Sequence, residues 1–258
     1  MLNRHIVYRV AVAVLVIDDF NDKILSGSAV QVRIVGLPDK PIRKSDGYFV
    51  FTTGRNEIRQ IEVESHFYHK AVINLEPGKL NPQRPVLKVR LQPNRLYAAP
   101  GNVTFLEGRA KPDSEIQVIP EIHHQNLKLL YDYQKDGKTE DREISLFQAE
   151  KKDLAGKNLA IREKEQKEPE VFQILETTDQ EQGTFLLAEA LSKGYKKAGT
   201  TILPVYTTKA DARGEYFLLL PGIEGKEACP CRIRCLADKE TTIKATLTPG
   251  QGNRQDLE

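Results

Sequence analysis

The sequence contains no tryptophan, its one methionine is residue 1, and it has three cysteines among 258 residues. Sites that stack a ligand on tryptophan or rely on a flexible methionine-rich surface are therefore excluded. An odd cysteine count without an export signal argues against a disulfide framework. Cys229, Cys231 and Cys235 could supply thiolates to zinc, but no nearby histidine completes the ligand set. The alternative is that alternate residues of this segment share one face of a strand.

The motifs of common enzyme families are also missing. The sequence has no G-x-S-x-G nucleophile elbow, no P-loop, no H-E-x-x-H zinc motif and no G-x-G-x-x-G dinucleotide fingerprint. The net charge of +2 arises from 38 basic and 36 acidic residues, without the basic surplus typical of nucleic-acid binding. We therefore predict a protein that is not an enzyme, carries no cofactor and does not bind nucleic acid.

Long apolar runs are scarce, and the most apolar segment is Ile6 to Ile17. It has the length of a signal-peptide core, but Arg9 interrupts it, Asp18 and Asp19 end it, and no small-residue cleavage site follows. It is too short to span a bilayer. The alternation of apolar side chains favours a β-strand. We expect a cytoplasmic protein that does not enter a membrane.

Two similar turns precede aromatic strands near the two ends of the chain. Asp46 and Gly47 lead into Tyr48-Phe49, and the stretch from Asp211 to Gly214 leads into Tyr216-Phe217. The glycines can adopt positive φ, the aspartates can accept hydrogen bonds from nearby backbone, and one aromatic residue of each pair should face a core. The repeated pattern predicts an all-β protein with two antiparallel, Ig-like or transthyretin-like β-sandwich domains.

The domain boundaries follow from clusters of proline and glycine. Residues 1–95 form the first predicted domain, and the proline-rich joint at 92–101 begins the second domain, 96–248. Short segments separated by turn residues predict strands in the first domain: Ile6–Asp18, Ala29–Val35, Tyr48–Thr53, Ile58–Glu64, Lys70–Leu75 and Val86–Leu91. The tail 249–258 has one apolar side chain and is expected to be flexible or ordered only against a partner.

The second domain is predicted to carry a large insertion at about 121–199, after which Thr200–Thr208 and Glu215–Leu220 resume the sandwich. Within it, Gln125–Tyr133 and Ile144–Gln148 predict one hairpin, and Lys157–Arg162 and Val171–Glu176 predict another. A helix over Glu143–Glu168 is the alternative, although Gly156 interrupts it and Pro169 ends it. The run of mixed charge at 151–170 predicts a solvated hairpin tip or a surface that docks protein.

Three groups of side chains are candidate metal ligands. His66 and His69, with Glu62 or Glu64, would form a zinc site; the alternative is an exposed bend. Calcium would use carboxylates without regular spacing, namely Asp18, Asp19, Asp22 and Asp46. His123 and His124 are adjacent, so on a strand they would point to opposite faces. We predict no metal site.

The segments Asp18–Val50 and Gly108–Leu220 resemble the carboxypeptidase regulatory-like, or transthyretin-like, domain family. The resemblance lies in the strand Val30–Ile34, the Ser45–Phe49 hairpin, Gly108–Ile116 and Asp211–Phe217. It implies sandwich domains that act as attachment or scaffolding modules, without peptidase activity. The layout of two such domains is also similar to that of accessory proteins of phage-tail-like contractile particles.

These observations predict a non-catalytic structural or adaptor protein. Its partners would be protein subunits of a larger assembly, including further copies of itself, and it would serve as a cap, baseplate or decoration component. The first alternative is a cell-surface adhesin or carbohydrate-binding module. The second is a metal-dependent hydrolase that uses His66 and His69.

Overall fold

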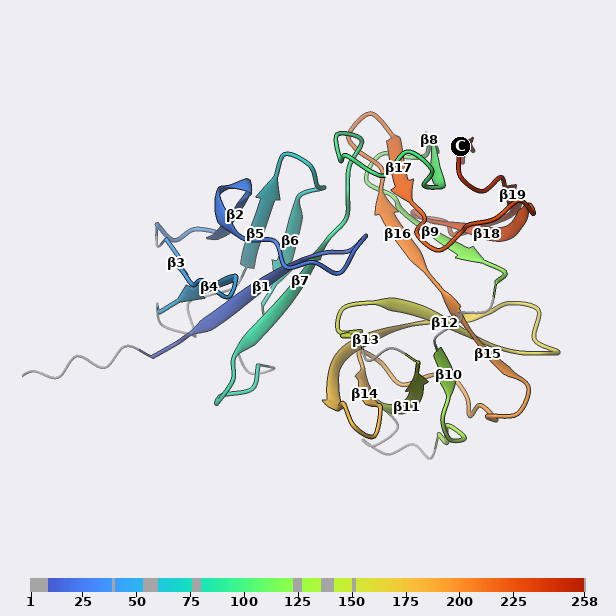
Figure 1. Ribbon diagram of the computed structural model, residues 1–258, viewed down its shortest axis with the longest axis horizontal. Helices are drawn as coiled ribbons and strands as arrows, with labels where there is room; N and C mark the ends of the chain where they lie inside the picture. Colours follow the sequence, from blue (N-terminus) through green and yellow to red (C-terminus); the bar gives the residue numbers. More distant parts are fainter. Residues whose placement is uncertain are drawn as a thin grey trace, which may run out of the picture. The chain divides into compact units, whose positions relative to one another are not determined.

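The protein is all-β. The computed structural model describes residues 9–38, 40–52, 60–75, 80–122, 127–135, 142–149 and 152–257, and these ranges contain β-strands and one short 3₁₀ turn, η1 (Gly27–Ala29), but no α-helix. The chain divides into two compact units, Met1–Ala98 and Ala99–Glu258. Figure 1 shows the course of the chain through both units.

Unit 1, Met1–Ala98, contains seven strands in two sheets: β1 (Val12–Asp18), β2 (Val30–Ile34), β3 (Ile42–Arg43), β4 (Tyr48–Phe51), β5 (Gln60–Ser65), β6 (Ala71–Asn74) and β7 (Val86–Leu91). The β1 sheet has the order β3-β4-β1-β7, and the β5 sheet has the order β2-β5-β6. Strand β1 pairs antiparallel with β4 and parallel with β7.

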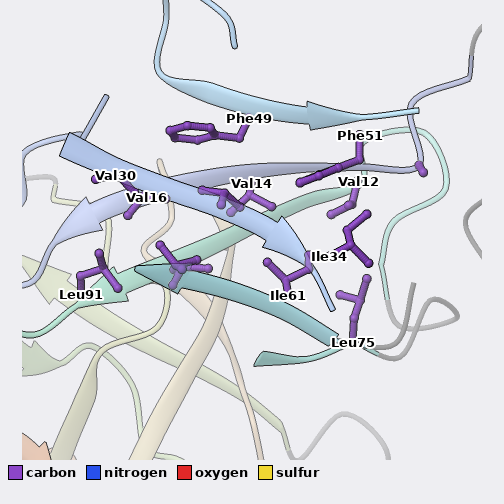
Figure 2. Close-up of a cluster of buried hydrophobic side chains, with 14 of the residues drawn as sticks. Val12, Val14, Val16, Val30, Ile34, Phe49, Phe51, Ile61, Leu75 and Leu91 are labelled. Atoms are coloured by element: carbon purple, nitrogen blue, oxygen red, sulfur yellow. The ribbon is translucent and has the colours of Figure 1, made fainter. Parts of the chain in front are cut away.

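The core of unit 1 lies between these two sheets, and both contribute side chains to it (Figure 2). Val12, Val14 and Val16 point into it from β1, and Val30 and Ile34 point into it from β2. Strand β2 alternates between buried and exposed residues, as expected for a strand with one face on a core. Strand β1 is buried at every position, so the alternation expected from its sequence is absent.

Unit 2, Ala99–Glu258, contains a framework of seven strands: β8 (Phe105–Arg109), β9 (Glu115–Pro120), β16 (Tyr206–Lys209), β17 (Glu215–Leu219), β18 (Cys229–Leu236), β19 (Thr241–Leu247) and β20 (Gly252–Arg254). The β8 sheet has the order β17-β8-β20, and the β9 sheet has the order β16-β9-β18-β19. One hydrophobic cluster draws side chains from both, including Leu106, Val118, Leu218 and Ile233.

Unit 1 and the framework of unit 2 follow one strand plan. In each, the first strand pairs antiparallel with the fourth and parallel with the last. In each, the second, fifth and sixth strands are consecutive neighbours in the other sheet. Only the third strand differs, because β3 pairs with β4 whereas β16 pairs with β9.

The remaining strands of unit 2 form a six-stranded, barrel-like sheet between β9 and β16: β10 (Leu127–Leu129), β11 (Glu143–Gln148), β12 (Asn158–Glu163), β13 (Glu170–Asp179), β14 (Thr184–Leu187) and β15 (Thr200–Pro204). Their order is β10-β11-β14-β13-β12-β15. The two edge strands, β10 and β15, lie against each other. Tyr133 and Tyr195 exchange two backbone hydrogen bonds of 2.9 Å beside them, which nearly closes the barrel.

The predicted strands of the first domain appear as β1, β2, β4, β5, β6 and β7, and both predicted hairpins of the insertion form, as β10–β11 and β12–β13. The helical alternative for Glu143–Glu168 is wrong, because β11 and β12 occupy it. The assignment of Thr200–Pro204 to the sandwich is also wrong, because this segment is β15 and pairs with β12 of the barrel.

Two further expectations need correction. The sheets are not purely antiparallel, because β1–β7 and β8–β20 are parallel pairs. The tail, which we expected to be flexible, instead forms β20 in the β8 sheet. Beyond it, Gln255 N–H donates to the Glu107 carbonyl (2.9 Å) and Leu257 N–H to that of Arg109 (2.7 Å). Backbone pairing orders this segment without an apolar pattern.

Candidate functional site

The two predicted turns have the same backbone geometry. Gly47 and Gly214 have φ of 90° and 76°, in the left-handed region that favours glycine. Gly47 N–H donates to the Lys44 carbonyl (3.1 Å), and Gly214 N–H donates to the Asp211 carbonyl (2.9 Å). In addition, the Lys44 N–H donates to the Tyr48 carbonyl, and the Asp211 N–H donates to the Glu215 carbonyl. Each turn therefore leads into the following strand with the same hydrogen bonds, although only the turn of unit 1 joins two paired strands, β3 and β4.

These hydrogen bonds show that the two aspartates are not equivalent. Asp211 lies at the first position of its turn and accepts from the N–H of Arg213 (2.8 Å) and Glu215 (2.9 Å). Asp46 lies at the third position, and the Tyr48 N–H reaches it only at 3.5 Å. The turns are structural, with the stronger side-chain cap in unit 2.

The same comparison corrects the alignment of the aromatic pairs. Superposing the glycines of the two turns matches Phe49 with Tyr216, one residue away from an alignment of the two Tyr-Phe dipeptides. Phe49 and Tyr216 are each 1% exposed and face a core. The Tyr216 hydroxyl donates to the Gln255 carbonyl (2.5 Å), so this core residue also holds the C-terminal segment.

The carboxylates considered for calcium are already engaged within unit 1. Buried Asp18 accepts from the Tyr97 hydroxyl (2.7 Å), the Tyr68 hydroxyl (3.0 Å) and the Phe20 N–H (2.8 Å). Burial and the neighbouring Asp18 raise the pKa of Tyr97 to about 12 and that of Tyr68 further. Both phenols thus remain hydrogen-bond donors to Asp18.

Arg90 holds two of the remaining calcium candidates. Its guanidinium lies 3.5 Å from Asp19 and 2.7 Å from Asp22, and its side chain is 6% exposed. Asp46 lies in its turn, with the Tyr48 N–H directed towards it. Each of the four carboxylates therefore has a local partner, and the arrangement is a hydrogen-bonded support for the end of β1.

The residues considered for zinc lie at the end of β5 and in the following bend. His66 packs edge-to-face on Phe67, with ring centroids 5.1 Å apart, and both line a shallow depression of about 450 Å³. The His69 backbone N–H donates to the Gln92 carbonyl (2.9 Å). Glu62 forms ion pairs with Lys70 and Arg33 instead of facing an imidazole. These hydrogen bonds, from Lys70 first and Arg33 second, lower the pKa of Glu62 to about 2.

The three cysteines face the core of unit 2 from β18. Cys229, Cys231 and Cys235 are all buried, and all are free thiols. Burial raises the pKa of Cys229, and it raises that of Cys231 to about 12. The expectation that Cys231, Ile233 and Cys235 share one strand face is correct. At neutral pH the Cys231 thiol is protonated and packs as a small apolar side chain.

Within the described ranges, no group of three or more His, Cys, Asp or Glu side chains is arranged to hold a metal ion. His5, His123 and His124 lie outside those ranges. The described part of the chain contains no helix long and apolar enough to cross a membrane.

Side chains fill the interior of the inserted barrel. One cluster of fifteen buried side chains fills it, including Leu146, Ile161, Phe185 and the two tyrosines that close it. Small barrels are commonly filled by their own side chains in this way. The outer surface is therefore the part of the barrel that we consider for recognition.

Sequence reasoning missed how the barrel is mounted on the framework. Ile119 points away from the framework core and packs with Ala160 and Leu203 of the barrel wall, in a cluster with 0–1% exposure. Beside it, the Arg232 guanidinium of β18 bonds Glu121 (3.0 Å) and Glu168 (2.5 Å), and the Arg232 side chain is 7% exposed. An apolar contact and the ion pairs of a buried arginine with two partly exposed glutamates thus join the barrel to the β9 sheet.

The charged run in the barrel also has specific partners. Glu168 binds Arg232, and Glu163 lies 2.5 Å from the Lys193 ammonium. Glu170 accepts from the hydroxyls of Ser192 (2.6 Å) and Tyr195 (2.7 Å). The run forms the predicted hairpin, and Glu168 near its tip is 66% exposed. These three glutamates also join the hairpin to the framework and to the segment before β15.

The outer surface of the barrel carries the exposed apolar side chains of unit 2. Among the described residues of unit 2, three large apolar side chains are exposed: Tyr131 (66%), Phe147 (51%) and Leu175 (49%). Tyr131 follows β10, Phe147 lies on β11 and Leu175 lies on β13, so all three belong to the barrel. Within unit 2 the barrel surface is therefore the candidate functional site.

Comparisons with protein-family models, with curated proteins and with solved structures each find no match to this chain.

Proposed function

We propose that the protein is a non-catalytic structural or adaptor protein whose inserted barrel binds a protein partner. The observation that carries this proposal is that the three exposed large apolar side chains among the described residues of unit 2, Tyr131, Phe147 and Leu175, all belong to the barrel and none to the framework strands. Exposed aromatic and aliphatic side chains are the groups from which binding hot spots are built. Insertions on a rigid scaffold commonly carry recognition.

The fold assignment behind this proposal is that unit 1 and the framework of unit 2 are both transthyretin-like β-sandwiches of the carboxypeptidase regulatory-like kind. Their common strand plan and their shared turn geometry support the assignment. Sandwich domains of this type serve as rigid supports, which agrees with the packed mounting of the barrel through Ile119 and Arg232.

We place the protein in a larger multi-subunit assembly in the cytoplasm, as a cap, baseplate or decoration component of a phage-tail-like contractile particle. The support for this setting is the similarity of the two-domain layout to accessory proteins of such particles. The near balance of 38 basic and 36 acidic residues suits protein partners better than nucleic acid.

Affinity purification from the source cells tests the barrel as the binding surface. A Tyr131→Ser/Phe147→Ser/Leu175→Ser variant should lose co-purifying protein subunits at least about tenfold, because hot-spot side chains dominate binding energy. The matched control is Phe67→Ser/Val72→Ser/Leu96→Ser, which removes side chains of unit 1 that are 44%, 49% and 57% exposed. The control should retain the partner.

Two results would contradict the proposal. One is equal partner recovery with the barrel variant and the wild-type protein, in amounts measured by quantitative mass spectrometry. The other is turnover of a small molecule by the purified protein that disappears in a His66→Ala/His69→Ala variant, because this favours the hydrolase alternative.

A further inference from the structure

The strand plan shared by the two units leaves one position filled in unit 2 and open in unit 1. In unit 2, β16 lies along the outer edge of β9, with Tyr206 opposite Val118 and Lys209 opposite Glu115. The equivalent second strand of unit 1 is β2. Among the described residues, β2 pairs with β5 alone, because β3 joins the β1 sheet instead. The outer edge of β2 is therefore available to another strand.

The pattern of hydrogen bonds between β2 and β5 shows which backbone groups of β2 point to this edge. The Val35 N–H donates to the Gln60 carbonyl (3.0 Å), which assigns Val35, Arg33 and Gln31 to the hydrogen-bonded pairs with β5. Val30, Val32 and Ile34 alternate with them, so their N–H and C=O groups point to the outer edge, where the Ile34 carbonyl also accepts from the Leu37 N–H (3.4 Å). An unpaired row of such groups is a template for strand addition.

The side chains of β2 make this edge rigid and self-complementary. Val30, Val32 and Ile34 are 1–5% exposed in the core of unit 1, so the edge is already held in an extended form. Gln31 and Arg33 are exposed on the opposite face, and Val35, directly after the strand, is an exposed apolar residue at 43%. The outward face of β2 thus presents, in chain order, the amide of Gln31, the guanidinium of Arg33 and the apolar side chain of Val35.

We propose that β2 is a self-association surface that pairs antiparallel with β2 of a second copy of this chain, centred on Val32. This pairing places Gln31 of one copy opposite Arg33 of the other, and Val35 opposite Ala29, and each pair occurs twice because of the two-fold symmetry. It forms about six backbone hydrogen bonds and joins two three-stranded sheets into one. The inference goes beyond the proposed function, which concerns the barrel.

The charges on the outward face are compatible with this occupant. The Glu64 carboxylate lies on this face, 3.1 Å from Lys70 and 3.7 Å from Arg33, and its side chain is 40% exposed. Arg33 is bonded to Glu62, which is directly opposite it on β5, so each guanidinium is already paired within its own copy. The pairing therefore places the neutral amide of Gln31 opposite a guanidinium that is paired with a carboxylate, and no like charges lie directly opposite each other.

Another open edge, that of β19, lacks this property. Strand β19 spans Thr241–Leu247 and pairs with β18 alone among the described strands. Its central residue is Lys244, so self-pairing about the centre of β19 would place two ammonium groups opposite each other. Lysine at an edge opposes strand addition. Symmetric pairing is thus compatible with β2 and disfavoured at β19.

Analytical ultracentrifugation of the full chain over about 1 µM to 1 mM tests the proposal. We expect a monomer–dimer equilibrium that Gln31→Lys weakens about tenfold, because each dimer gains two repulsive Lys–Arg pairs. Gln31→Glu should tighten the dimer severalfold through attraction to the second copy's Arg33. Thr246→Lys, which adds the same charge to the exposed edge of β19, should leave the dissociation constant unchanged.

A monomer at every concentration would overturn the proposal, and so would a dimer whose dissociation constant is the same in Gln31→Lys. Folding is not at risk in this variant, since Lys at position 31 lies opposite Glu64 in the monomer. Either failure leaves the barrel proposal standing, because the Tyr131→Ser/Phe147→Ser/Leu175→Ser variant tests a different surface.

Hydrogen exchange locates the contact within the same samples. The Val30, Val32 and Ile34 amides should exchange more slowly as the protein concentration rises, whereas those of Gln31 and Arg33 already bond β5 and should not change. A dimer that forms without slowing the Val32 amide would show that another surface associates, which contradicts the proposal.

Discussion

Unit 1 and the framework of unit 2 use one strand plan and differ in the place of the third strand. Strand β3 lies beside β4 in the β1 sheet, and β16 lies beside β9 in the other sheet of its unit. In unit 2, β9 ends at Pro120 and the barrel strands follow. The last of them, β15, ends at Pro204, and one residue separates it from β16. Keeping the two ends of an insertion together limits its loop-closure cost. Pairing β16 with β9 does this directly.

Unit 1 has no such insertion, so its third strand is not tied to the second. Residues 35–41 link β2 to β3, and a tight turn then returns the chain from β3 to β4, with the Lys44 N–H bonded to the Tyr48 carbonyl (2.8 Å). Strand β3 therefore follows its hairpin partner. In unit 2 the insertion adds a surface, and β16, which follows it, covers the edge of β9. Among the described residues, the equivalent edge in unit 1, that of β2, stays open.

The largest expected effect concerns the pairing of first and last strands in unit 2. A Cβ added at Gly108 would overlap the Gln255 carbonyl oxygen, which is backbone and has little freedom to move. Gly108→Ala should displace the segment after β20 from β8 and cost about 3 kcal/mol of unfolding free energy. Urea denaturation measures this cost. Gly101→Ala meets no atoms and serves as the control; equal stability of the two variants would contradict the close approach.

The next prediction compares the two equivalent turns. Both glycines have positive φ, but an added Cβ meets the Ala110 backbone carbonyl at Gly214 and the Ile24 side chain at Gly47. Because Ile24 is 51% exposed and can move, Gly47→Ala should cost about 1–2 kcal/mol and Gly214→Ala about 2–3 kcal/mol.

Thermal or urea unfolding of both single variants checks this order. Adding Ile24→Ala to Gly47→Ala should recover only the steric part of the cost, since the backbone conformation stays unfavourable for alanine. A larger loss at Gly47 than at Gly214 would show that the turns differ in a way that their hydrogen bonds do not reveal.

Much of the strand content was predictable because its signals are local. Val86–Leu91 is predicted with its observed bounds, and the turns at Asp46-Gly47 and Asp211–Gly214 mark the starts of β4 and β17. Local signals also separated β11 and β12 from a helix, through Gly156 and the lack of a continuous apolar face.

The rest depends on contacts between distant residues. Nothing in Thr200–Pro204 indicates that it pairs with β12 instead of the framework, and Gly252–Arg254 pairs through its backbone without an apolar pattern. The contacts that join the barrel to the framework could not be predicted from the sequence either, because Arg232 and Glu168 lie 64 residues apart. The exposed side chains of the candidate site became recognisable only when burial was known. Alternation within β13 could have indicated Leu175.

The mounting of the barrel gives a smaller effect. Arg232→Met removes the cation that bonds Glu121 and Glu168, whose side chains are 28% and 66% exposed. Because water reaches both glutamates, we expect a loss of about 2 kcal/mol, below that of a fully buried pair. Arg254→Met, at a side chain that is 68% exposed, should leave the unfolding free energy nearly unchanged. Equal effects would argue against the ion pair as part of the mounting.

The smallest effect is a pH dependence in unit 1. Lys70 and Arg33 lower the pKa of Glu62 from 4.5 to about 2. The stabilisation is therefore complete above about pH 5 and is lost as the pH falls through 4.5 towards 2. It is small, because the Lys70 and Arg33 side chains are 49% and 60% exposed.

Urea midpoints measured between about pH 5 and pH 2 test this sign. The wild-type midpoint should fall further over this range than that of Glu62→Gln, which cannot lose a charge there. Parallel curves for the two proteins would mean that the ion pairs of Glu62 do not contribute to stability.

The position of the third strand is tested most directly by nuclear Overhauser contacts between backbone protons in deuterated protein. We predict cross-strand contacts of Thr207 with Gln117, and of Ile42 with Val50, together with no contact between Ile42 and Val32. Contacts from Ile42 to β2 would show that both units place the third strand on the same sheet, and they would contradict both the comparison and the open edge derived from it.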